Sequence, residues 1–379
     1  MIVAAVMHAT YNALVEKIRV DRPDGRYLFL YALERAAPAL LDAPALERGS
    51  EQLELRWNPL LDEWVIVSTG RQWRTFLPPD ASGPLCPTRD PASPTELPVA
   101  DFELAAFENR FPSLRAAPGA AEPGARLERR APAAGACEVV VYSPEHDGAL
   151  ASMSQAQVRG LVDVWADRYT DLAARDDVAY VFVFENRGKE IGVTLTHPHG
   201  QIYAFSYVPP QVEAEQRAAR RHFDETGECL QCDVIAQELA SGARIVAESH
   251  GFVAYVPFAA RVPYEVHVAA AAHRESLLDL RPAERDGLAA ILRGVQAMYD
   301  ALWGFAMPYT MCIHQRPTDG VERPGDHLHI EFMPPYRTKD RLKYLAGVET
   351  GAGTFINDTA PEERAAELRE ARRKVTGDR

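Results

Sequence analysis

The segment VFVFENRGKEIGVTLTHPHGQIYAF (residues 181–205) holds two β-rich runs, with His197-Pro198-His199-Gly200-Gln201 between them. Side chains alternate along extended backbone, so His197 and His199 are expected to point to the same side. Proline between them fixes φ and removes a backbone donor, and Gly200 lets another group approach closely. A bare pair of histidines two residues apart is typical of structural or metal-binding residues. These neighbours instead favour an imidazole that attacks phosphorus.

The composition is that of an ordinary globular protein, large enough for one or two domains. Of 379 residues, 47% are hydrophobic and 25% are charged. The net charge of −13 argues against a nucleic-acid-binding protein, although a site for a small anionic substrate can be locally basic. No apolar stretch reaches the roughly 18 residues of a membrane span, and residues 1–7 lack the basic start of a signal peptide. Five scattered cysteines fit a reducing cytoplasm.

One order of segments occurs twice along the chain. Ser154 and Gln157 form a capping box for a helix to about Ala174, ahead of the first histidine motif. A helix at 282–303 comes before His327-Leu328-His329-Ile330-Glu331. The similar order and spacing indicate a duplicated αβ unit, with the chemistry kept in the first copy, although chance could give the same pattern. We expect strands at 63–68, 138–142 and 309–314 and irregular structure at 78–98 and 112–132, all within an α+β fold, while the fold of residues 1–50 is left open.

Gln201 distinguishes group transfer from hydrolysis. His199 would attack phosphorus and form a phosphoramidate, from which a second acceptor collects the group. An amide can donate and accept hydrogen bonds, but it cannot protonate a leaving group as a third histidine could. Glutamine therefore suits a leaving group that needs little protonation, such as a sugar phosphate. It also suits an intermediate that must survive until the second substrate arrives.

The residues before the motif offer contacts for a nucleotide. Phe184 offers a stacking surface, Asn186 a partner for a base or ribose edge, and Thr194 a hydroxyl for a phosphate oxygen. Taken alone, this segment is a strand followed by a turn, and it gains meaning from its place just before His197. The chain contains no G-x-G-x-x-G or Walker loop, so nucleotide binding by those routes is disfavoured.

The run FENRGKEIGVTLTHPHGQ (residues 184–201) resembles the signature of the galactose-1-phosphate uridylyltransferase family, a branch of the histidine-triad superfamily. The likeness extends from Arg56-Trp57-Asn58-Pro59 through Glu349. It implies two histidine-triad-like units that form a mostly antiparallel half-barrel sheet with flanking helices. Residues 51–210 would be the catalytic half and residues 211–379 the half with the hexose-recognition segment. The resemblance also implies a cytoplasmic homodimer that acts in galactose metabolism.

The resemblance implies ping-pong transfer of UMP between UDP-glucose and galactose 1-phosphate. His199 would be the uridylylated nucleophile, and Gln201 would steady the phosphoryl oxygens. Without the resemblance, Arg71 and Arg74 could equally belong to a solvated turn, and Glu349 would be a surface carboxylate. The implied contacts are Asn109, Arg110 and Asn186 for uridine, Arg71 and Arg74 for the sugar phosphate, and Lys343, Tyr344, Val348 and Glu349 for the hexose.

Two metal sites of the family fall on this chain, and the chain departs from the family pattern at both. A zinc site made of C-x-x-C and two histidines falls on Cys86, His146 and His197, but Gly83 stands where the first cysteine belongs. The sequence therefore leaves open whether this site binds zinc. The second site would be structural and hold iron or zinc, and it falls on Glu215, His314, His329 and Glu331, the last of which often is histidine in the family.

The lone C-x-x-C at Cys229-Leu230-Gln231-Cys232 is a separate feature. A thioredoxin-like redox motif needs a strand before it and a helix after it, and only the helix is evident. We therefore expect two reduced cysteines at a helix start, with adventitious metal binding as the alternative.

Two other functions stay open at this point. The same His-Gln pair would serve a nucleotidylyltransferase or phosphorylase that acts on another nucleoside diphosphate sugar, such as ADP-glucose, or on dinucleoside polyphosphates. A non-catalytic nucleotide-binding or sensing protein of the same fold is favoured only by the incomplete cysteine pair. Intact His199 and Gln201 argue against it.

Overall fold

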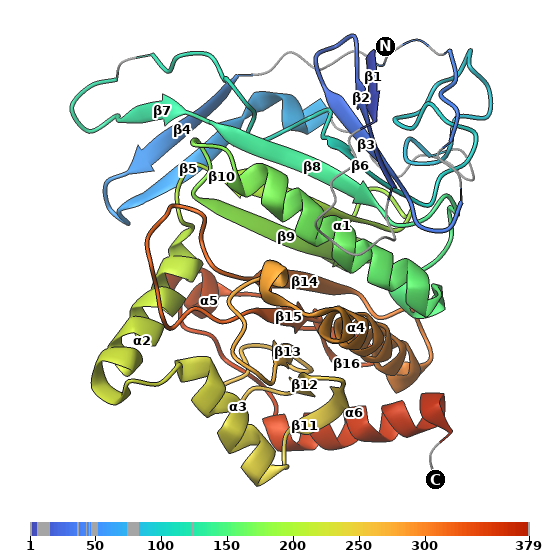
Figure 1. Cartoon of the computed structure of the whole chain (residues 1–379). Helices are drawn as coiled ribbons and strands as arrows, with labels where there is room; N and C mark the ends of the chain where they lie inside the picture. Colours follow the sequence, from blue (N-terminus) through green and yellow to red (C-terminus); the bar gives the residue numbers. More distant parts are fainter. Residues whose placement is uncertain are drawn as a thin grey trace.

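A twelve-stranded antiparallel sheet forms the frame of the protein (Figure 1). The structure is a computed structural model that describes residues 2–5, 16–35, 38–42, 44, 46, 52–73, 83–122 and 124–377. In sheet order the strands are β1 (Ile2–Ala5), β2 (Glu16–Asp21), β3 (Tyr27–Ala32), β6 (Leu104–Glu108), β8 (Gly135–Val141), β10 (His199–Phe205), β9 (Tyr180–Arg187), β14 (Tyr309–His314), β15 (His329–Met333), β13 (Val266–Ala270), β12 (Phe252–Tyr255) and β11 (Ile245–Ser249).

The sheet consists of two copies of one plan. In the first half β3, β6 and β8 lie side by side, and α1 (Gln155–Ala173) then leads to the pair β9 and β10. In the second half β11, β12 and β13 lie side by side, and α4 (Pro282–Trp303) leads to the pair β14 and β15. The halves join where β9 pairs with β14. The predicted α+β fold with a duplicated unit is confirmed.

The two faces of the sheet differ in what covers them. In β10 the side chains of Ile202 and Ala204 are buried against α1, where Trp165 fills the same core. Figure 1 shows α1 and α4 together on one face, and the two helices pack against each other. The alternate residues of β10, His199 and Gln201 among them, point to the opposite face because side chains alternate along a strand. The helices thus bury one face and leave the other for the site.

The remaining elements surround this frame. A small sheet is made of β5 (Glu63–Ser68), β4 (Leu53–Asn58) and β7 (Arg130–Pro132). The C-terminal helix α6 (Pro361–Thr376) packs on α4. The other elements are α2 (Pro210–Thr226), α3 (Leu230–Ser241), α5 (Gly347–Ala352), α6 (Pro361–Thr376), the pair β16 (Tyr336–Thr338) and β17 (Arg341–Leu342), and the 3₁₀ turns η1 (Thr69–Trp73), η2 (Leu150–Ser152), η3 (Lys189–Ile191) and η4 (Leu277–Asp279).

Locally encoded elements match the expectation well. The strands at 63–68 and 309–314 and the helix at 282–303 have the predicted bounds. One correction concerns 112–132, expected to be irregular throughout, because 130–132 form β7 at the edge of the small sheet, where proline needs no donor. Residues 16–32, whose fold the sequence left open, add β2 and β3 to the main sheet. None of the helices in the described residues is long and apolar enough to cross a membrane.

Candidate active site

His199 is the first residue of β10 and is held in one orientation by its own motif. Its Nδ1 lies 2.7 Å from the carbonyl oxygen of His197. A carbonyl oxygen only accepts, so Nδ1 carries the proton and donates, which leaves the lone pair on Nε2. Burial lowers the pKa of His199, although the bond to the carbonyl opposes this shift. A neutral imidazole with a free Nε2 lone pair is the form that a nucleophile requires.

Gly200 is glycine because other atoms occupy the place of a side chain. A Cβ there would collide with the Tyr142 hydroxyl and lie 3.1 Å from the Phe184 carbonyl oxygen. The backbone of this strand is also fixed by the Tyr142 amide, which donates to the Pro198 carbonyl at 3.1 Å. The group that approaches Gly200 closely therefore belongs to the protein core. It lies on the face of the strand opposite to His199.

His199 lines a cavity of 130 Å³ on the face of the sheet opposite to α1. The cavity brings together residues that are far apart in the sequence. Six of the predicted site residues line it: Arg71, Asn109, Arg110, Thr194, His199 and Gln201.

The polar lining of this cavity is ordered by local hydrogen bonds. Arg71 donates to the Phe111 carbonyl and to the Tyr203 hydroxyl, both at 3.1 Å. Asn109 accepts from the Phe111 amide at 2.9 Å, which closes a turn. The Arg110 guanidinium lies over the Phe111 ring, 5.4 Å from its centroid. The cavity that His199 lines therefore also holds two guanidinium groups.

Other predicted site residues lie outside the cavity lining. Phe184 pairs with Gln201 across β9 and β10 and stacks on Phe182, so it borders the same face. Asn186 follows on β9, opposite Thr310 of β14. Arg74 lies outside the described residues.

The predicted hexose segment also lies apart from the cavity within this chain. Lys343 and Glu349 form an ion pair of 2.7 Å, and this contact lowers the pKa of Glu349 to about 2. Tyr344 and Val348, between them in sequence, expose 74% and 45% of their surface. The two apolar side chains are thus presented outward by a segment that its own ion pair holds in shape.

The structure adds cavity residues that sequence reasoning missed. Leu85, Phe107 and Val139 are buried and form an apolar wall. Glu96 also lines the cavity and pairs with Arg22 at 2.6 Å. Glu96 also pairs with Arg26, at 2.9 Å. Residues 16–35, which carry both arginines, thereby hold a side chain of the cavity lining in place. No local motif marks these residues, because their roles depend on contacts between distant segments.

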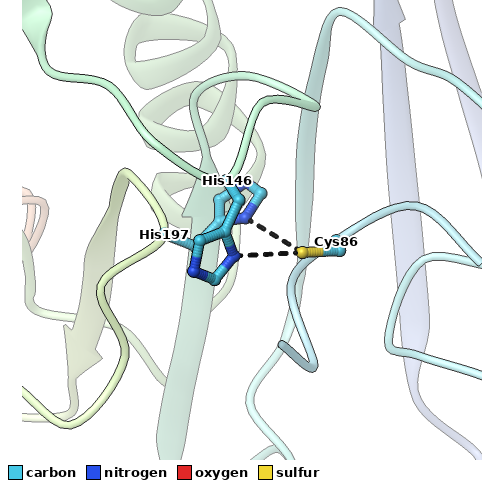
Figure 2. A group of neighbouring side chains, drawn as sticks. All are labelled: Cys86, His146 and His197. Carbon is cyan, nitrogen blue, oxygen red and sulfur yellow. Dashed lines mark hydrogen bonds between the residues drawn. The ribbon is translucent and has the colours of Figure 1, made fainter. Parts of the chain in front are cut away.

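The first candidate metal site is formed by Cys86, His146 and His197 (Figure 2). The Nδ1 atoms of His146 and His197 face the Cys86 sulfur at 3.3 and 3.6 Å. Each histidine uses Nε2 elsewhere, since that of His197 donates to the Ser143 carbonyl at 2.7 Å and that of His146 lies 3.2 Å from the Thr196 hydroxyl. Such outer contacts orient histidines for metal binding.

Gly83 accounts for the missing ligand of this site. A Cβ at Gly83 would lie 3.3 Å from Cε1 of His146, so a side chain at this position would enter the cluster. The three remaining donors fit zinc, with the fourth position left to a non-protein ligand such as water.

The second candidate metal site joins α2 to the second half of the sheet. Glu215 of α2 accepts from Nδ1 of His314 at 2.8 Å, and the rings of His314 and His329 stack with centroids 4.9 Å apart. Glu331 lies 3.8 Å from both of these histidines, but Arg261 pairs with it at 2.8 Å. Glu215, His314 and His329 therefore fit a metal ion, and Glu331 is already neutralised by a cation.

Comparisons with known proteins agree on one family. The model of the N-terminal domain of galactose-1-phosphate uridyl transferase matches residues 46–209, and that of its C-terminal domain matches residues 215–376. The chain is 43% identical over 324 residues to the galactose-1-phosphate uridylyltransferase of Thermotoga maritima, covering 84% of this chain and 98% of that protein. It is 35% identical over 373 residues to the galactose-1-phosphate uridylyltransferase of Streptomyces lividans, covering 94% of this chain and 98% of that protein.

Solved structures resemble the whole fold as well. A uridylyltransferase superposes with a TM-score of 0.76 at 35% identity, over 85% of this chain and 99% of that chain. An ADP-glucose phosphorylase from Arabidopsis thaliana superposes with a TM-score of 0.63 at 27% identity, over 84% and 99%.

Proposed function

This chain belongs to the galactose-1-phosphate uridylyltransferase family and is a nucleotidyltransferase, and we propose that it transfers UMP from UDP-glucose to galactose 1-phosphate through His199. Nε2 of His199 attacks the phosphorus of the uridylyl group. A P–N bond forms, the bond from this phosphorus to the bridging oxygen breaks, and glucose 1-phosphate leaves with the electron pair. A phosphate oxygen of galactose 1-phosphate then attacks the same phosphorus, and the P–N bond breaks to restore the imidazole.

The observation that carries this proposal is the position of His199, at a cavity edge with Nδ1 held by the His197 carbonyl at 2.7 Å. Gln201 lines the same cavity and offers an amide to the phosphoryl oxygens. Arg71 and Arg110 supply positive charge where phosphate charge collects. Because the Gln201 amide cannot take a proton from an attacking water at neutral pH, it does not promote hydrolysis of the intermediate.

The uridine would lie between the apolar wall and the polar rim of the cavity. Leu85, Phe107 and Val139 suit the faces of a base, and Asn109 offers hydrogen bonds to its edge. Phe184 and Asn186 border this face, and we assign them to the nucleotide. Thr194 would bind a phosphate oxygen.

The hexose would be read by Lys343, Tyr344, Val348 and Glu349. These residues do not line the cavity of their own chain. Tyr344 and Val348 are exposed, so they are accessible to another protomer. We propose a homodimer in which this segment of one protomer reaches the active site of its partner. Arg71, together with Arg74, would hold the sugar phosphate.

Metal ions would be structural in this mechanism. Zinc would be held by Cys86, His146 and His197, and iron or zinc by Glu215, His314 and His329, with Glu331 as a weak ligand. When bound, such an ion would tighten the loops that carry its ligands, while His199 is itself the nucleophile in the step at phosphorus. The five cysteines form no disulfide bond, which suits a reducing compartment, and for this compartment we propose the cytoplasm.

Incubation with labelled UDP-glucose and intact-mass measurement test the nucleophile. The wild-type chain should gain one uridylyl group, whereas His199→Ala should gain none and lose transfer by more than about a thousandfold. Added imidazole should restore part of the activity of His199→Gly. His222→Ala, on α2 and away from the cavity lining, is the control and should behave as wild type. Label retained on His199→Ala would overturn the assignment.

The alternative substrate is tested in the same assay. ADP-glucose and inorganic phosphate replace UDP-glucose and galactose 1-phosphate, one at a time. We expect a uridylyl adduct and galactose 1-phosphate as the better acceptor. An adenylyl adduct released by phosphate would instead favour a phosphorylase, and a chain without any adduct would favour a nucleotide-binding protein.

A further inference from the structure

Glu96 is the only acid among the described residues that line the cavity with His199. It is 4% exposed and shares the lining with the apolar wall of Leu85, Phe107 and Val139. Burying a carboxylate among apolar groups is unfavourable unless it is paired and hydrogen-bonded. No step of the proposed transfer at phosphorus uses this carboxylate, so its presence in the lining requires another reason.

Two arginines hold Glu96 through one of its two carboxylate oxygens. Nη1 of Arg22 and Nη1 of Arg26 donate to Oε2 of Glu96 at 2.6 and 2.9 Å. The Arg22 guanidinium also donates to the backbone carbonyl of Glu96. Asp24 accepts from Nε of Arg26 at 2.6 Å, and these residues belong to the turn between β2 and β3. The turn therefore fixes the carboxylate, while Oε1 takes part in neither arginine contact and is left to accept from a ligand.

The register of the sheet sets the length of the cavity. Gln201 of β10 pairs with Val139 of β8, and Val139 pairs with Phe107 of β6. All three residues line the cavity. Because neighbouring strands are about 4.8 Å apart, the backbone at Phe107 is about 10 Å from that at Gln201. This span suits a nucleotide whose phosphorus lies at His199 and Gln201 and whose base lies at Phe107.

Glu96 lies at the base end of this span. Nη1 of Arg26, which donates to Glu96, lies 3.4 Å from the carbonyl oxygen of Glu108, the last residue of β6. Asn109 follows in the chain and also lines the cavity. Its side-chain oxygen accepts from the Phe111 amide, which leaves its amino group to donate. The base end therefore offers one acceptor, Oε1 of Glu96, and one donor, the amino group of Asn109.

We propose that Glu96 selects uracil by accepting a hydrogen bond from its N3–H, an inference that rests on the proposed uridylyl transfer. The edge of uracil carries one donor, N3–H, between two acceptors, O2 and O4. A carboxylate only accepts, so Glu96 matches the donor, and the Asn109 amino group matches one of the carbonyl oxygens. Cytosine presents an acceptor at N3, and two acceptors that face each other in a buried site leave a hydrogen bond unmade. The site therefore favours uracil over cytosine.

Adduct formation from UDP-glucose and from CDP-glucose tests this selection. Intact mass measures the second-order rate constant with which each donor transfers its nucleotidyl group to the chain. The wild-type chain should prefer UDP-glucose by at least about a hundredfold. Glu96→Gln offers an amide that can donate to N3 of cytosine, so this preference should fall at least about tenfold. Glu96→Asp keeps the charge for the arginines but withdraws the carboxylate from the base, and it should slow the reaction of UDP-glucose more than that of CDP-glucose.

Asp24→Asn is the matched control. It removes a carboxylate from the same group of ion pairs, but Asp24 does not line the cavity, so its preference for UDP-glucose should equal that of the wild type. A purely structural role for Glu96 predicts equal slowing of both donors. Variants at Glu96 that keep the wild-type preference would overturn the inference, while their uridylyl adduct would still support the proposed function. A wild-type chain that takes up neither nucleotidyl group would overturn both.

Discussion

At the scale of the residue, Gly200 shows how the core acts on the motif. The Tyr142 hydroxyl occupies the space of a side chain at Gly200, and the Phe184 carbonyl oxygen would lie 3.1 Å from a Cβ there. His199 and Gln201 flank this glycine on the opposite face of β10. A shift of the strand at Gly200 would therefore displace both groups that act on phosphorus.

Gly200→Ala should lower both stability and transfer. The new methyl group overpacks the core, at a cost of about 1–3 kcal/mol. Tyr142→Phe removes the colliding hydroxyl, so the double variant should recover part of the loss. Urea unfolding of the two single variants and the double variant measures this coupling. Strictly additive losses would mean that the hydroxyl does not clash with the added methyl.

Gln201→His should convert part of the transfer activity into hydrolysis. An imidazole can take a proton from water, which an amide cannot do at neutral pH. We expect the uridylyl adduct of this variant to decay several times faster in the absence of galactose 1-phosphate. Gln201→Asn keeps an amide and is the control. Adducts of equal lifetime in the two variants would remove the proposed protective role of Gln201.

At the scale of the element, α1 has the cap that its sequence encodes. The backbone N–H of Gln157 donates to the Ser154 hydroxyl at 3.1 Å, and the backbone N–H of Ser154 donates to the side-chain oxygen of Gln157 at 2.9 Å. Ser154→Ala should cost about 1 kcal/mol of unfolding free energy, because a helix-end amide loses its partner. Ser154→Asp should retain most of it. Equal loss in both variants, measured by urea unfolding, would contradict the capping role.

At the scale of the whole molecule, a buried polar chain connects the two halves. Gln296 of α4 donates to the Tyr309 hydroxyl at 2.6 Å, and Tyr309 donates to Glu185 of β9 at 2.8 Å. Tyr142, the residue after β8, faces the same carboxyl group, and Arg187 is the nearby cation. Burial raises the pKa of Glu185 from 4.5 to about 7. The folded chain therefore favours the protonated carboxyl group.

Stability should fall as the pH rises through this window. The stabilising contribution of protonated Glu185 is complete below pH 4.5 and is lost as the pH passes 7, a change of about 3 kcal/mol. Glu185→Gln cannot ionise, so its stability relative to wild type should increase between pH 5 and pH 8. Urea unfolding of both proteins over this range measures the difference. A difference that does not vary with pH would show that Glu185 stays in one protonation state.

Local features of this protein can be predicted from its amino-acid sequence. Capping residues and period-two patterns predicted α1, α4, β5 and β14, because these signals act within a few neighbouring residues. The types of residue in His197–Gln201 indicated a phosphorus chemistry, since imidazole, proline, glycine and amide each restrict what the motif can do. The repeat of helix and histidine motif predicted the duplicated sheet.

Contacts between residues that are distant in the sequence became visible only in the folded chain. Glu96 reaches the cavity through Arg22 and Arg26 of the N-terminal segment, although no pattern in the sequence marks that contact. The sequence predicted two reduced cysteines at a helix start, and Cys229 and Cys232 indeed form no disulfide there, but only the folded chain shows that His273 lies beside them. These meetings depend on how strands from separate parts of the chain pair and pack, and a one-dimensional pattern does not specify which side chains then converge.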